Sequence, residues 1–334
     1  MLSLGIESSA DKLGVGIIDN DGKILANIRR TYKPPIGSGI HPREASEFHA
    51  KNIPDVINEA LNTSKLTMDD IDIVSFTKGP GLGPCLRVGA VAARTLALKY
   101  KKPLVGVNHP IAHVEIGRLV GNMVDPVVLY VSGGNTQIIA FSEGRYRVFG
   151  ETIDIPVGNC LDVFGRNAGL SDKKSPMGRV IELLAEKGTK YIPIPYVIKG
   201  MDVSFSGILT HISRLIKKNE YTLEDLSYSL QETVFAMLVE VTERALAHTK
   251  KNEVLVCGGV ASNNRLKEML KVMAESHESR FFGLEPSLAI DNGLMIAWLG
   301  LIMYRRGYST PLKETIVDQH YRVEDVVVNW RNEN

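Results

Sequence analysis

Two histidines, His109 and His113, are the strongest local signal for chemistry in this 334-residue sequence. They stand in the run Asn108-His109-Pro110-Ile111-Ala112-His113. Proline suits the first position of a helix, which would put His109 at or next to the cap. His113 would lie one turn further along the same face, where two imidazoles can share a metal ion. The alternative to a metal site is that His109 only caps the helix and His113 is a half-buried helical residue. A metalloprotease is excluded, because Pro110 replaces the glutamate that its motif requires.

Two histidines leave a metal ion under-coordinated, so oxygen ligands must come from elsewhere in the chain. Asp291 stands at the start of the last apolar helical pattern, where capping the helix is its alternative role. Tyr130 ends an apolar strand and could equally be a core aromatic residue. As a phenolate ligand it would suit a strongly Lewis-acidic ion, iron above all.

Three glycine-bearing turns follow apolar strands, at residues 5–9, 132–135 and 258–264. Turns without Cβ atoms let backbone N–H groups approach phosphate oxygens. None of them has the sequence of a Walker A loop or of a dinucleotide-binding loop. Each alone could be an ordinary turn, but the three together suit a nucleotide held in a cleft between two domains. Asp162 and Glu182, on separate expected helices, could accept hydrogen bonds from ribose hydroxyls, or be solvated surface charges.

The elements expected around these residues alternate between strands and helices, as in α/β folds. Strands are expected at residues 2–7, 13–19, 23–30, 71–77, 103–108, 127–131, 137–141, 145–149, 253–257 and 280–283. Helices are expected at residues 41–64 (broken in two by Pro54), 86–100, 110–121, 158–170, 179–187, 223–251, 265–276 and 292–306. An irregular segment is expected from residue 188 to 205, and a polar loop at residues 199–207.

A meander of strand, small-residue turn, strand, glycine turn and strand occurs twice, about 125 residues apart. It predicts two related domains, residues 1–124 and 125–306, the second with helical insertions. Residues 307–334 would form a tail that packs back on the core. Chance is the alternative, because such meanders are common.

Composition describes an ordinary globular protein. The formal net charge is +1, 44% of residues are hydrophobic and 23% are charged, so no global field draws the chain to RNA or to a membrane. The longest uncharged apolar run, residues 294–304, is shorter than the ~20 residues of a spanning helix. Three separated cysteines make no disulfide framework, and the first residues lack a signal-peptide pattern. We expect a cytoplasmic protein with no membrane partner.

Six segments in order along the chain resemble the signatures of the tRNA threonylcarbamoyladenosine transferases. They are residues 5–11, 108–113, 130–137, 199–207, 257–266 and 291–297. That family belongs to the actin/sugar-kinase/heat-shock ATPase superfamily. The resemblance therefore implies two duplicated actin-like or ribonuclease-H-like domains with a nucleotide-binding cleft between them. Residues 41–45, 132–137 and 199–207 look like the archaeal and eukaryotic branch, the catalytic subunit of the KEOPS complex.

The resemblance also implies roles for individual residues. His109, His113 and Asp291 match the family's metal ligands, and Tyr130 matches the extra phenolate ligand of archaeal-type members. Positions that hold threonylcarbamoyl-AMP, or ATP or AMP, are matched by Tyr130, Val131, Ser132, Gly133, Gly134, Asp162, Gly178, Glu182 and Asn263. The chain departs from the family at Ser171-Asp172-Lys173-Lys174-Ser175-Pro176-Met177-Gly178, where members have a His-Pro-Gly-Gly-Pro-like run.

The implied reaction moves a threonylcarbamoyl group from threonylcarbamoyl-AMP to N6 of the tRNA adenosine 3′ of the anticodon. One metal ion, iron or zinc, would grip the donor. The general base is unassigned, with Glu7 and Asp11 as candidates. The implied partners are tRNA, a small atypical protein kinase and two further small subunits. The alternatives are a small-molecule kinase of the same fold, which would need an acidic base, and a non-enzymatic ATP-gated scaffold, which would be indifferent to chelators.

Overall fold

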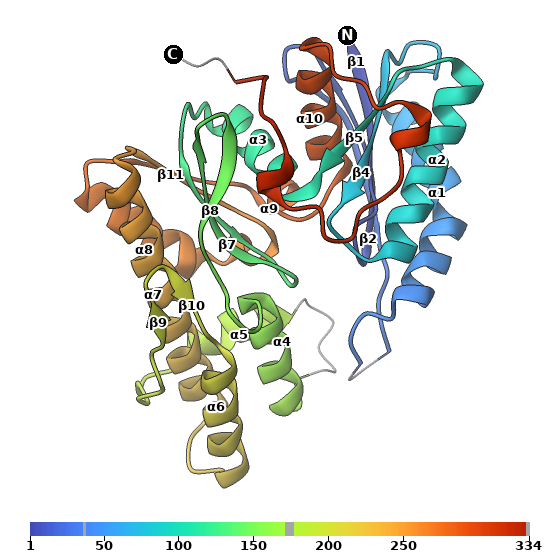
Figure 1. The fold of residues 1–334 in the computed structure, drawn as a ribbon. Coiled ribbons are helices and arrows are strands. Elements are labelled where there is room, and N and C mark those ends of the chain that lie inside the picture. The colour runs from blue at the N-terminus through green and yellow to red at the C-terminus, as the bar shows by residue number, and fades with distance from the viewer. Residues whose placement is uncertain (36–37, 171–176, 332–334) are drawn as a thin grey trace. The chain divides into compact units, whose positions relative to one another are not determined.

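The computed structural model describes residues 1–35, 38–170 and 177–331 (Figure 1). The chain divides into two compact units, each with its own five-stranded sheet. The first unit comprises Met1–Leu119, Ser142–Tyr146 and Ile290–Asn334, and the second comprises Val120–Phe141 and Arg147–Ala289. The predicted domain boundaries, after residues 124 and 306, concern the duplicated sequence and stay a prediction.

The first sheet has the strand order β3-β2-β1-β4-β5. Its strands are β1 (Leu2–Glu7), β2 (Lys12–Asp19), β3 (Ile24–Thr31), β4 (Ile73–Gly79) and β5 (Leu104–Asn108). β1, β2 and β3 form an antiparallel meander, and β4 and β5 run parallel to β1. Parallel strands end at the same edge, so the chain that follows β1, β4 and β5 meets there.

Two faces of this sheet are covered by different helices (Figure 1). On one face, Leu4 and Ile6 of β1 join the apolar cluster formed with α1 (Pro42–Ser64) and α2 (Gly83–Tyr100). Alternate residues point to the other face, where α10 (Gly293–Arg305) packs. A Cβ atom on Gly5 or Gly16 would lie 2.2 or 2.3 Å from the backbone of α10, so only glycine permits this approach.

α1 is one continuous helix, so the predicted break at Pro54 was wrong. A proline inside a helix removes the hydrogen bond to the carbonyl four residues earlier, here that of Ala50. Ala50 and Pro54 are both exposed. The carbonyl that lacks a helical partner therefore faces water instead of the core, and the helix continues.

The second sheet repeats the topology of the first, with the strand order β8-β7-β6-β11-β12. Its strands are β6 (Val127–Val131), β7 (Thr136–Ser142), β8 (Arg145–Glu151), β11 (Glu253–Cys257) and β12 (Arg280–Gly283). β6 leads the meander, and β11 and β12 run parallel to it. The shared order confirms the duplication that the repeated meander predicted.

Helices supply most of the remaining core of the second unit. They are α4 (Val157–Asn167), α5 (Met177–Ala185), α6 (Ser206–Lys218), α7 (Leu223–Thr249), α8 (Asn264–Ser276) and α9 (Pro286–Ala289). α6 and the two-residue strands β9 (Ile198–Lys199) and β10 (Asp202–Val203) were not predicted. α6 buries Ile208 and Ile212 in the apolar cluster that also contains residues of α7.

α3 (His109–Gly121) follows β5 directly and belongs to the first unit up to Leu119. The last described segment of the chain also lies on this unit. Thr310 N donates to the Leu104 carbonyl (2.7 Å), and Trp330 Nε1 donates to the carboxylate of Glu115 on α3 (2.8 Å). Within the described residues, no helix is both long enough and apolar enough to cross a bilayer.

Candidate metal centre

His109 and His113 lie in the first turns of α3. Asn108, at the end of β5, accepts a hydrogen bond from Ile111 N (3.2 Å), so an asparagine side chain satisfies one of the free N–H groups where the helix begins. The two imidazole rings are four residues apart and nearly perpendicular, with centroids 4.9 Å apart. Both side chains are buried. The predicted pairing of the rings on one face of a helix is confirmed.

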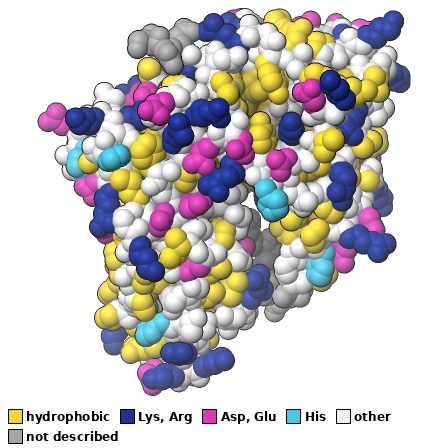
Figure 2. Space-filling view, in the orientation of Figure 1, with side chains coloured by type: hydrophobic (Ala, Val, Ile, Leu, Met, Phe, Trp, Pro, Cys, Tyr) yellow, Lys and Arg dark blue, Asp and Glu magenta, His cyan; other side chains and the backbone are white. Residues whose placement is uncertain are grey.

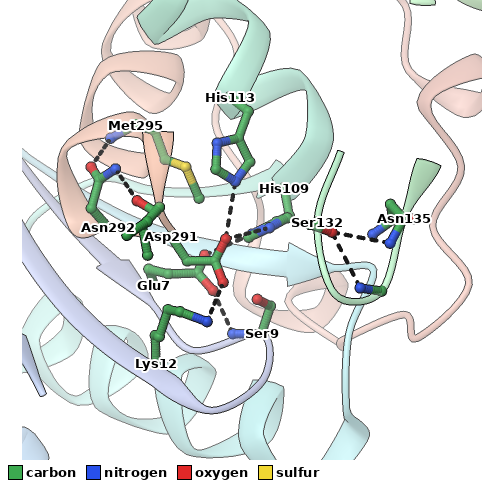
Figure 3. Close-up of polar contacts among 12 residues, drawn as sticks. Glu7, Ser9, Lys12, His109, His113, Ser132, Asn135, Asp291, Asn292 and Met295 are labelled. Carbon is green, nitrogen blue, oxygen red and sulfur yellow. Dashed lines mark hydrogen bonds and ion pairs between the residues drawn. The ribbon is translucent and has the colours of Figure 1, made fainter. Parts of the chain in front are cut away.

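Asp291 brings a carboxylate to the same point from the residues before α10. Its Oδ1 lies 3.1 Å from Nε2 of His113 and 3.5 Å from Nε2 of His109 (Figure 3). The capping role considered for Asp291 is filled by its neighbour, because Asn292 Oδ1 accepts from Met295 N (3.1 Å). The carboxylate of Asp291 is therefore available to the histidines.

The three side chains have the spacing of ligands around one metal ion. Their donor atoms all lie within 4.8 Å of one another. With metal–ligand bonds of about 2.1 Å, neighbouring ligand atoms lie about 3.0–3.4 Å apart. Of the two Nε2–Oδ1 distances, 3.1 Å lies within that range and 3.5 Å just above it. Two imidazoles and a carboxylate also form the donor set that zinc and ferrous iron accept.

The charges of these groups are strongly coupled. Burial alone would lower the pKa of His109, but the charge of Glu7 and the hydrogen bonds with Asp291 and Glu7 raise it to about 10. Burial lowers the pKa of His113. Burial would raise the pKa of Asp291, but the charge of Lys12 and the hydrogen bonds to the two histidines hold it well below its usual range. Asp291 is therefore an ionised carboxylate at neutral pH.

Lys12 and Glu7, from the first two strands, surround the three candidate ligands. Lys12 Nζ lies 3.5 Å from Asp291 Oδ2 (Figure 3) and 2.8 Å from Asp11 Oδ1. Asp11 thus forms an ion pair with Lys12. Glu7 is fully buried, and its Oε2 lies 2.9 Å from Nδ1 of His109. Sequence reasoning missed Lys12, whose only signal was its position beside the turn after β1. That turn contains no glycine, because Gly5 of the predicted glycine-bearing turn lies within the strand.

Tyr130 and the glycine turn after β6 belong to the second unit. Tyr130 is buried at the end of β6, and its role as a metal ligand stays a prediction. In the turn, Ser132 Oγ accepts from Gly134 N (3.3 Å) and from Asn135 N (3.0 Å). A Cβ atom at Gly133 or Gly134 would meet no heavy atom within 4 Å, so the turn is open to a ligand.

Glu182 and Asn263, two predicted nucleotide contacts, lie close together. Glu182 Oε1 accepts from Asn264 N (2.8 Å), and Asn263 Oδ1 caps α8 by accepting from Leu266 N (3.2 Å). Gln231 of α7 holds the Asn263 amide (2.9 Å) and was missed by sequence reasoning, because nothing in its local pattern distinguishes it.

The remaining predicted contacts of the second unit lie on two helices. Asp162 is on α4, and Gly178 is in the first turn of α5, the helix that carries Glu182. Residues 171–176, where the chain departs from the motif of the resembling family, lie outside the described residues. Val131, between Tyr130 and the turn, is buried in the core, so only its backbone could meet a ligand.

The sequence matches the model of a known family. A family model described as TsaD, tRNA N6-adenosine threonylcarbamoyltransferase, matches residues 23–298. The enzyme of that name from Thermococcus sibiricus is 54% identical over 330 residues, which cover 99% of this chain and 100% of that protein. The human protein of the same name is 53% identical over 333 residues, covering 98% of this chain and 99% of that protein.

A third relative is longer than this chain. It is named "Probable bifunctional tRNA threonylcarbamoyladenosine biosynthesis protein", comes from Methanobrevibacter smithii, and is 54% identical over 334 residues. The match covers all of this chain and 61% of that protein.

Solved structures resemble this chain in fold at low sequence identity. HypF from T. kodakarensis has a TM-score of 0.64 at 14% identity, over 94% of this chain and 50% of that one. The (R)-2-hydroxyglutaryl-CoA dehydratase component A of Acidaminococcus fermentans has a TM-score of 0.57 at 15% identity, over 90% and 98%. The duplicated sheets and these neighbours confirm the predicted two-domain actin-like fold.

Proposed function

The chain belongs to the tRNA N6-adenosine threonylcarbamoyltransferase family, and we propose on that basis that it transfers a threonylcarbamoyl group to N6 of an adenosine in tRNA. The donor is threonylcarbamoyl-AMP, and AMP is released. The acceptor is the adenosine immediately 3′ of the anticodon in tRNAs that read codons beginning with A.

One observation of the structure carries the metal-dependent form of this proposal: the convergence of His109, His113 and Asp291. A small-molecule kinase of this fold would need an acidic base for a substrate hydroxyl, and an imidazole pair has no role in that chemistry. A nucleotide-gated scaffold has no use for a metal centre. The cluster therefore favours the transferase over both alternatives.

In this proposal the two histidines and Asp291 hold one ion, with Tyr130 as a further phenolate ligand. Iron fits this donor set best, and zinc is the alternative. When bound, the ion supplies positive charge that orients the threonylcarbamoyl end of the donor and polarises its carbonyl oxygen. Burial of the two histidines excludes water from one side of that site.

The adenylate of the donor is held by residues of the second unit. The open turn at Ser132, Gly133 and Gly134 binds the phosphate through backbone N–H groups. Ser132 N donates to the Asn135 carbonyl (2.8 Å) and Gly134 N to Ser132 Oγ (3.3 Å), so a phosphate would bind the Gly133 N–H and compete for the other two. Glu182 and Asp162 accept hydrogen bonds from the ribose hydroxyls, and Gly178 and Asn263 line the adenosine site. The short separation between Glu182 and the start of α8 supports a shared ribose and base pocket.

Positioning of the two substrates is the main contribution required of the protein. The exocyclic amine of adenine is a poor nucleophile, because its lone pair is delocalised into the ring. An activated donor with AMP as leaving group removes part of that barrier. Holding donor and amine in contact can contribute roughly 7–11 kcal/mol.

The partners proposed for the chain are tRNA and the KEOPS subunits, including a small atypical protein kinase, in the cytoplasm. The formal net charge of +1 supports tRNA binding that is shared with other subunits.

The test is transfer with purified components. The protein, threonylcarbamoyl-AMP and unmodified tRNA, with and without the partner subunits, should yield modified tRNA and an equal amount of AMP. The double variant His109→Ala/His113→Ala should lose both products. Undiminished transfer by that variant would refute the role of the metal, and the absence of transfer by every reconstituted wild-type mixture would refute the proposed reaction.

A further inference from the structure

Glu7 is the fully buried carboxylate at the end of β1, and donors occupy both of its oxygens. Oε1 accepts from Ser9 N (2.6 Å). Oε2 accepts from Thr77 Oγ1 (2.6 Å) and lies 2.9 Å from Nδ1 of His109. Glu7 thus contacts one nitrogen of the His109 ring, Nδ1, and Asp291 lies near the other, Nε2; Figure 3 shows the three side chains together. The three partners come from different elements, the turn after β1, β4 and α3, which together hold this one side chain in place.

The contact with Glu7 holds a proton on one particular nitrogen of His109, Nδ1. Oε1 of Glu7 accepts from the backbone N–H of Ser9, and Oε2 accepts from the hydroxyl of Thr77, so both oxygens act as acceptors. An accepting oxygen needs a donor in its contact with His109, and the N–H of the ring is that donor. The proton in this contact must therefore sit on Nδ1 of His109, which leaves Nε2 to face Asp291 and the candidate metal position.

The hydrogen bonds of Glu7 argue against its predicted role as a general base. A general base needs an oxygen within hydrogen-bond reach of the proton that it removes. Both oxygens of Glu7 already accept short hydrogen bonds from groups of the protein, and no part of the side chain is exposed. Its one polar contact directed toward the candidate metal ligands is His109.

We propose that Glu7 is a positioning residue, which fixes the ring of His109 with Nδ1 protonated so that Nε2 is presented to the metal ion. Ser9 and Thr77 in turn fix Glu7. The proposal rests on the metal centre of the proposed function and extends it from the ligands to the group that orients one of them. Partners of metal-bound histidines of this kind typically alter metal affinity by 10–100-fold.

Glu7→Gln is the discriminating variant because it keeps the size of the side chain and removes its charge. A glutamine has one acceptor oxygen and one amide donor group. If its oxygen faces His109, its NH₂ group meets the N–H of Ser9. If its NH₂ group faces His109 instead, Nδ1 must become the acceptor and the proton moves to Nε2, which a metal ion cannot share.

Glu115 provides a matched control in the same unit. It is buried on α3 and also accepts from three donors: Tyr146 Oη (2.6 Å), Trp330 Nε1 (2.8 Å) and Arg118 (2.6 Å). Glu115→Gln makes the identical chemical change at a carboxylate that binds the last described segment and not the histidines. Any loss of metal affinity that follows from a buried Glu→Gln change as such should appear in both variants.

The experiment measures Zn²⁺ affinity of the full chain by competition with a chelating dye, alongside thermal unfolding of the metal-free protein. Glu7→Gln should weaken Zn²⁺ binding by 10–100-fold, and Glu115→Gln should leave it within about twofold of wild type. In the zinc-loaded protein, long-range ¹H–¹⁵N spectra should show a protonated Nδ1 in His109, and this signature should be lost in Glu7→Gln. Glu7→Asp, which keeps the charge on a shorter side chain, should fall between the two.

Two results would overturn the proposal: wild-type Zn²⁺ affinity in a folded Glu7→Gln variant, or equal weakening by Glu115→Gln. If Glu7→Gln does not fold, the Glu7→Asp variant decides, and wild-type affinity in that variant rejects the proposal. These measurements use the metal alone, without tRNA or donor. Failure of the transfer assay would therefore count against the proposed reaction and leave the role of Glu7 standing.

Discussion

Asp291 Oδ1 lies 3.1 Å from Nε2 of His113, although 178 residues separate the two in the chain. Asp291 and His113 can meet because α10, the helix that follows Asp291, packs on the first sheet although it comes from the C-terminal part of the sequence. α10 packs on β1 and β2 through glycines, and the residue before its cap is thereby delivered to the start of α3.

Loss of the carboxylate at Asp291 should abolish tight metal binding. In Asp291→Asn the shape is kept, but an anionic ligand becomes a neutral one and Lys12 loses an ion-pair partner. Zn²⁺ affinity should fall by more than the 10–100-fold typical of a lost outer partner, and transfer activity should fall with it. Asp69→Asn, at an exposed position in the same unit, is the control and should bind zinc as wild type does. Unchanged affinity in Asp291→Asn would remove it from the ligand set.

The cap of α10 should couple stability to the metal centre. Asn292→Ala removes the acceptor for Met295 N and should destabilise the protein by about 1 kcal/mol. Because the cap fixes the residue beside Asp291, Zn²⁺ affinity should also decline. Urea unfolding and the dye competition measure the two effects. Asn292→Asp, which keeps an oxygen acceptor, should restore most of the stability. A destabilised protein with wild-type affinity would show that the cap does not position Asp291.

Close packing between β2 and α10 predicts a severe effect of one added methyl group. In Gly16→Ala the new Cβ would lie 2.3 Å from Leu294 N, a backbone atom that cannot turn aside. Overpacking of this kind costs typically 1–3 kcal/mol. Gly207→Ala in α6, where nothing lies within 4 Å, should be neutral or mildly stabilising. Comparison of the two midpoints in urea tests the prediction, which fails if the two variants unfold alike.

Asp154 should make the stability of the second unit dependent on acid. Its carboxylate accepts from Ser204 Oγ (2.6 Å), Phe205 N (3.0 Å) and Ser206 N (3.1 Å), at the point where α6 begins. Burial opposes ionisation, but these hydrogen bonds lower its pKa below the usual value. The stabilisation is therefore complete above the unfolded-state pKa of about 3.9 and is lost as the pH falls toward the folded value.

Asp154→Ala measures that contribution directly. At pH 7 it should cost about 0.5–2 kcal/mol, the range for a lost helix cap. The difference in unfolding free energy between wild type and variant should shrink below pH 4. Asp202→Ala does not serve as a control for Asp154→Ala, because the carboxylate of Asp202 also accepts a backbone hydrogen bond, from Glu151 N of β8 (2.9 Å). If the difference in unfolding free energy between wild type and Asp154→Ala stays constant from pH 7 to pH 3, the ionised carboxylate of Asp154 does not stabilise the second unit.

The repeated meander allowed much of the fold to be predicted, because short apolar runs and the turns between them are local signals. The apolar runs at residues 2–7 and 13–19 and their repetition at residues 127–131 and 137–141 correspond to β1, β2, β6 and β7. The continuity of α1 was missed because the effect of Pro54 depends on whether the carbonyl of Ala50 is exposed. An exposed carbonyl can lose its helical hydrogen bond at little cost, whereas a buried one cannot. α6 was not predicted: the expected polar loop ended at residue 207 and no element was expected at residues 208–222, although Ile208 and Ile212 have the spacing of one helix face.

The histidine pair of the candidate metal centre follows from helix periodicity, but its companions do not. Nothing near Asp291 in the sequence points to His113, and Thr77 and Lys12 meet the site only because β4 and β2 flank β1. The roles of Asp291, Thr77 and Lys12 therefore depend on the three-dimensional fold and leave no local signal in the sequence. Gln231 is similar, since its link to Asn263 depends on how α7 lies beside the loop after β11.

The first unit is assembled from both ends of the polypeptide, and this determines when the protein can mature during its synthesis. The ribosome releases His109 and His113 long before α10 and Trp330 exist. Val120–Ala289, by contrast, contains nearly everything that its own sheet needs. A nascent chain can thus fold its second unit while still attached, but it cannot bring Asp291 to the two histidines until translation is almost finished. Truncated products would carry both imidazoles without the carboxylate that meets them in the full chain.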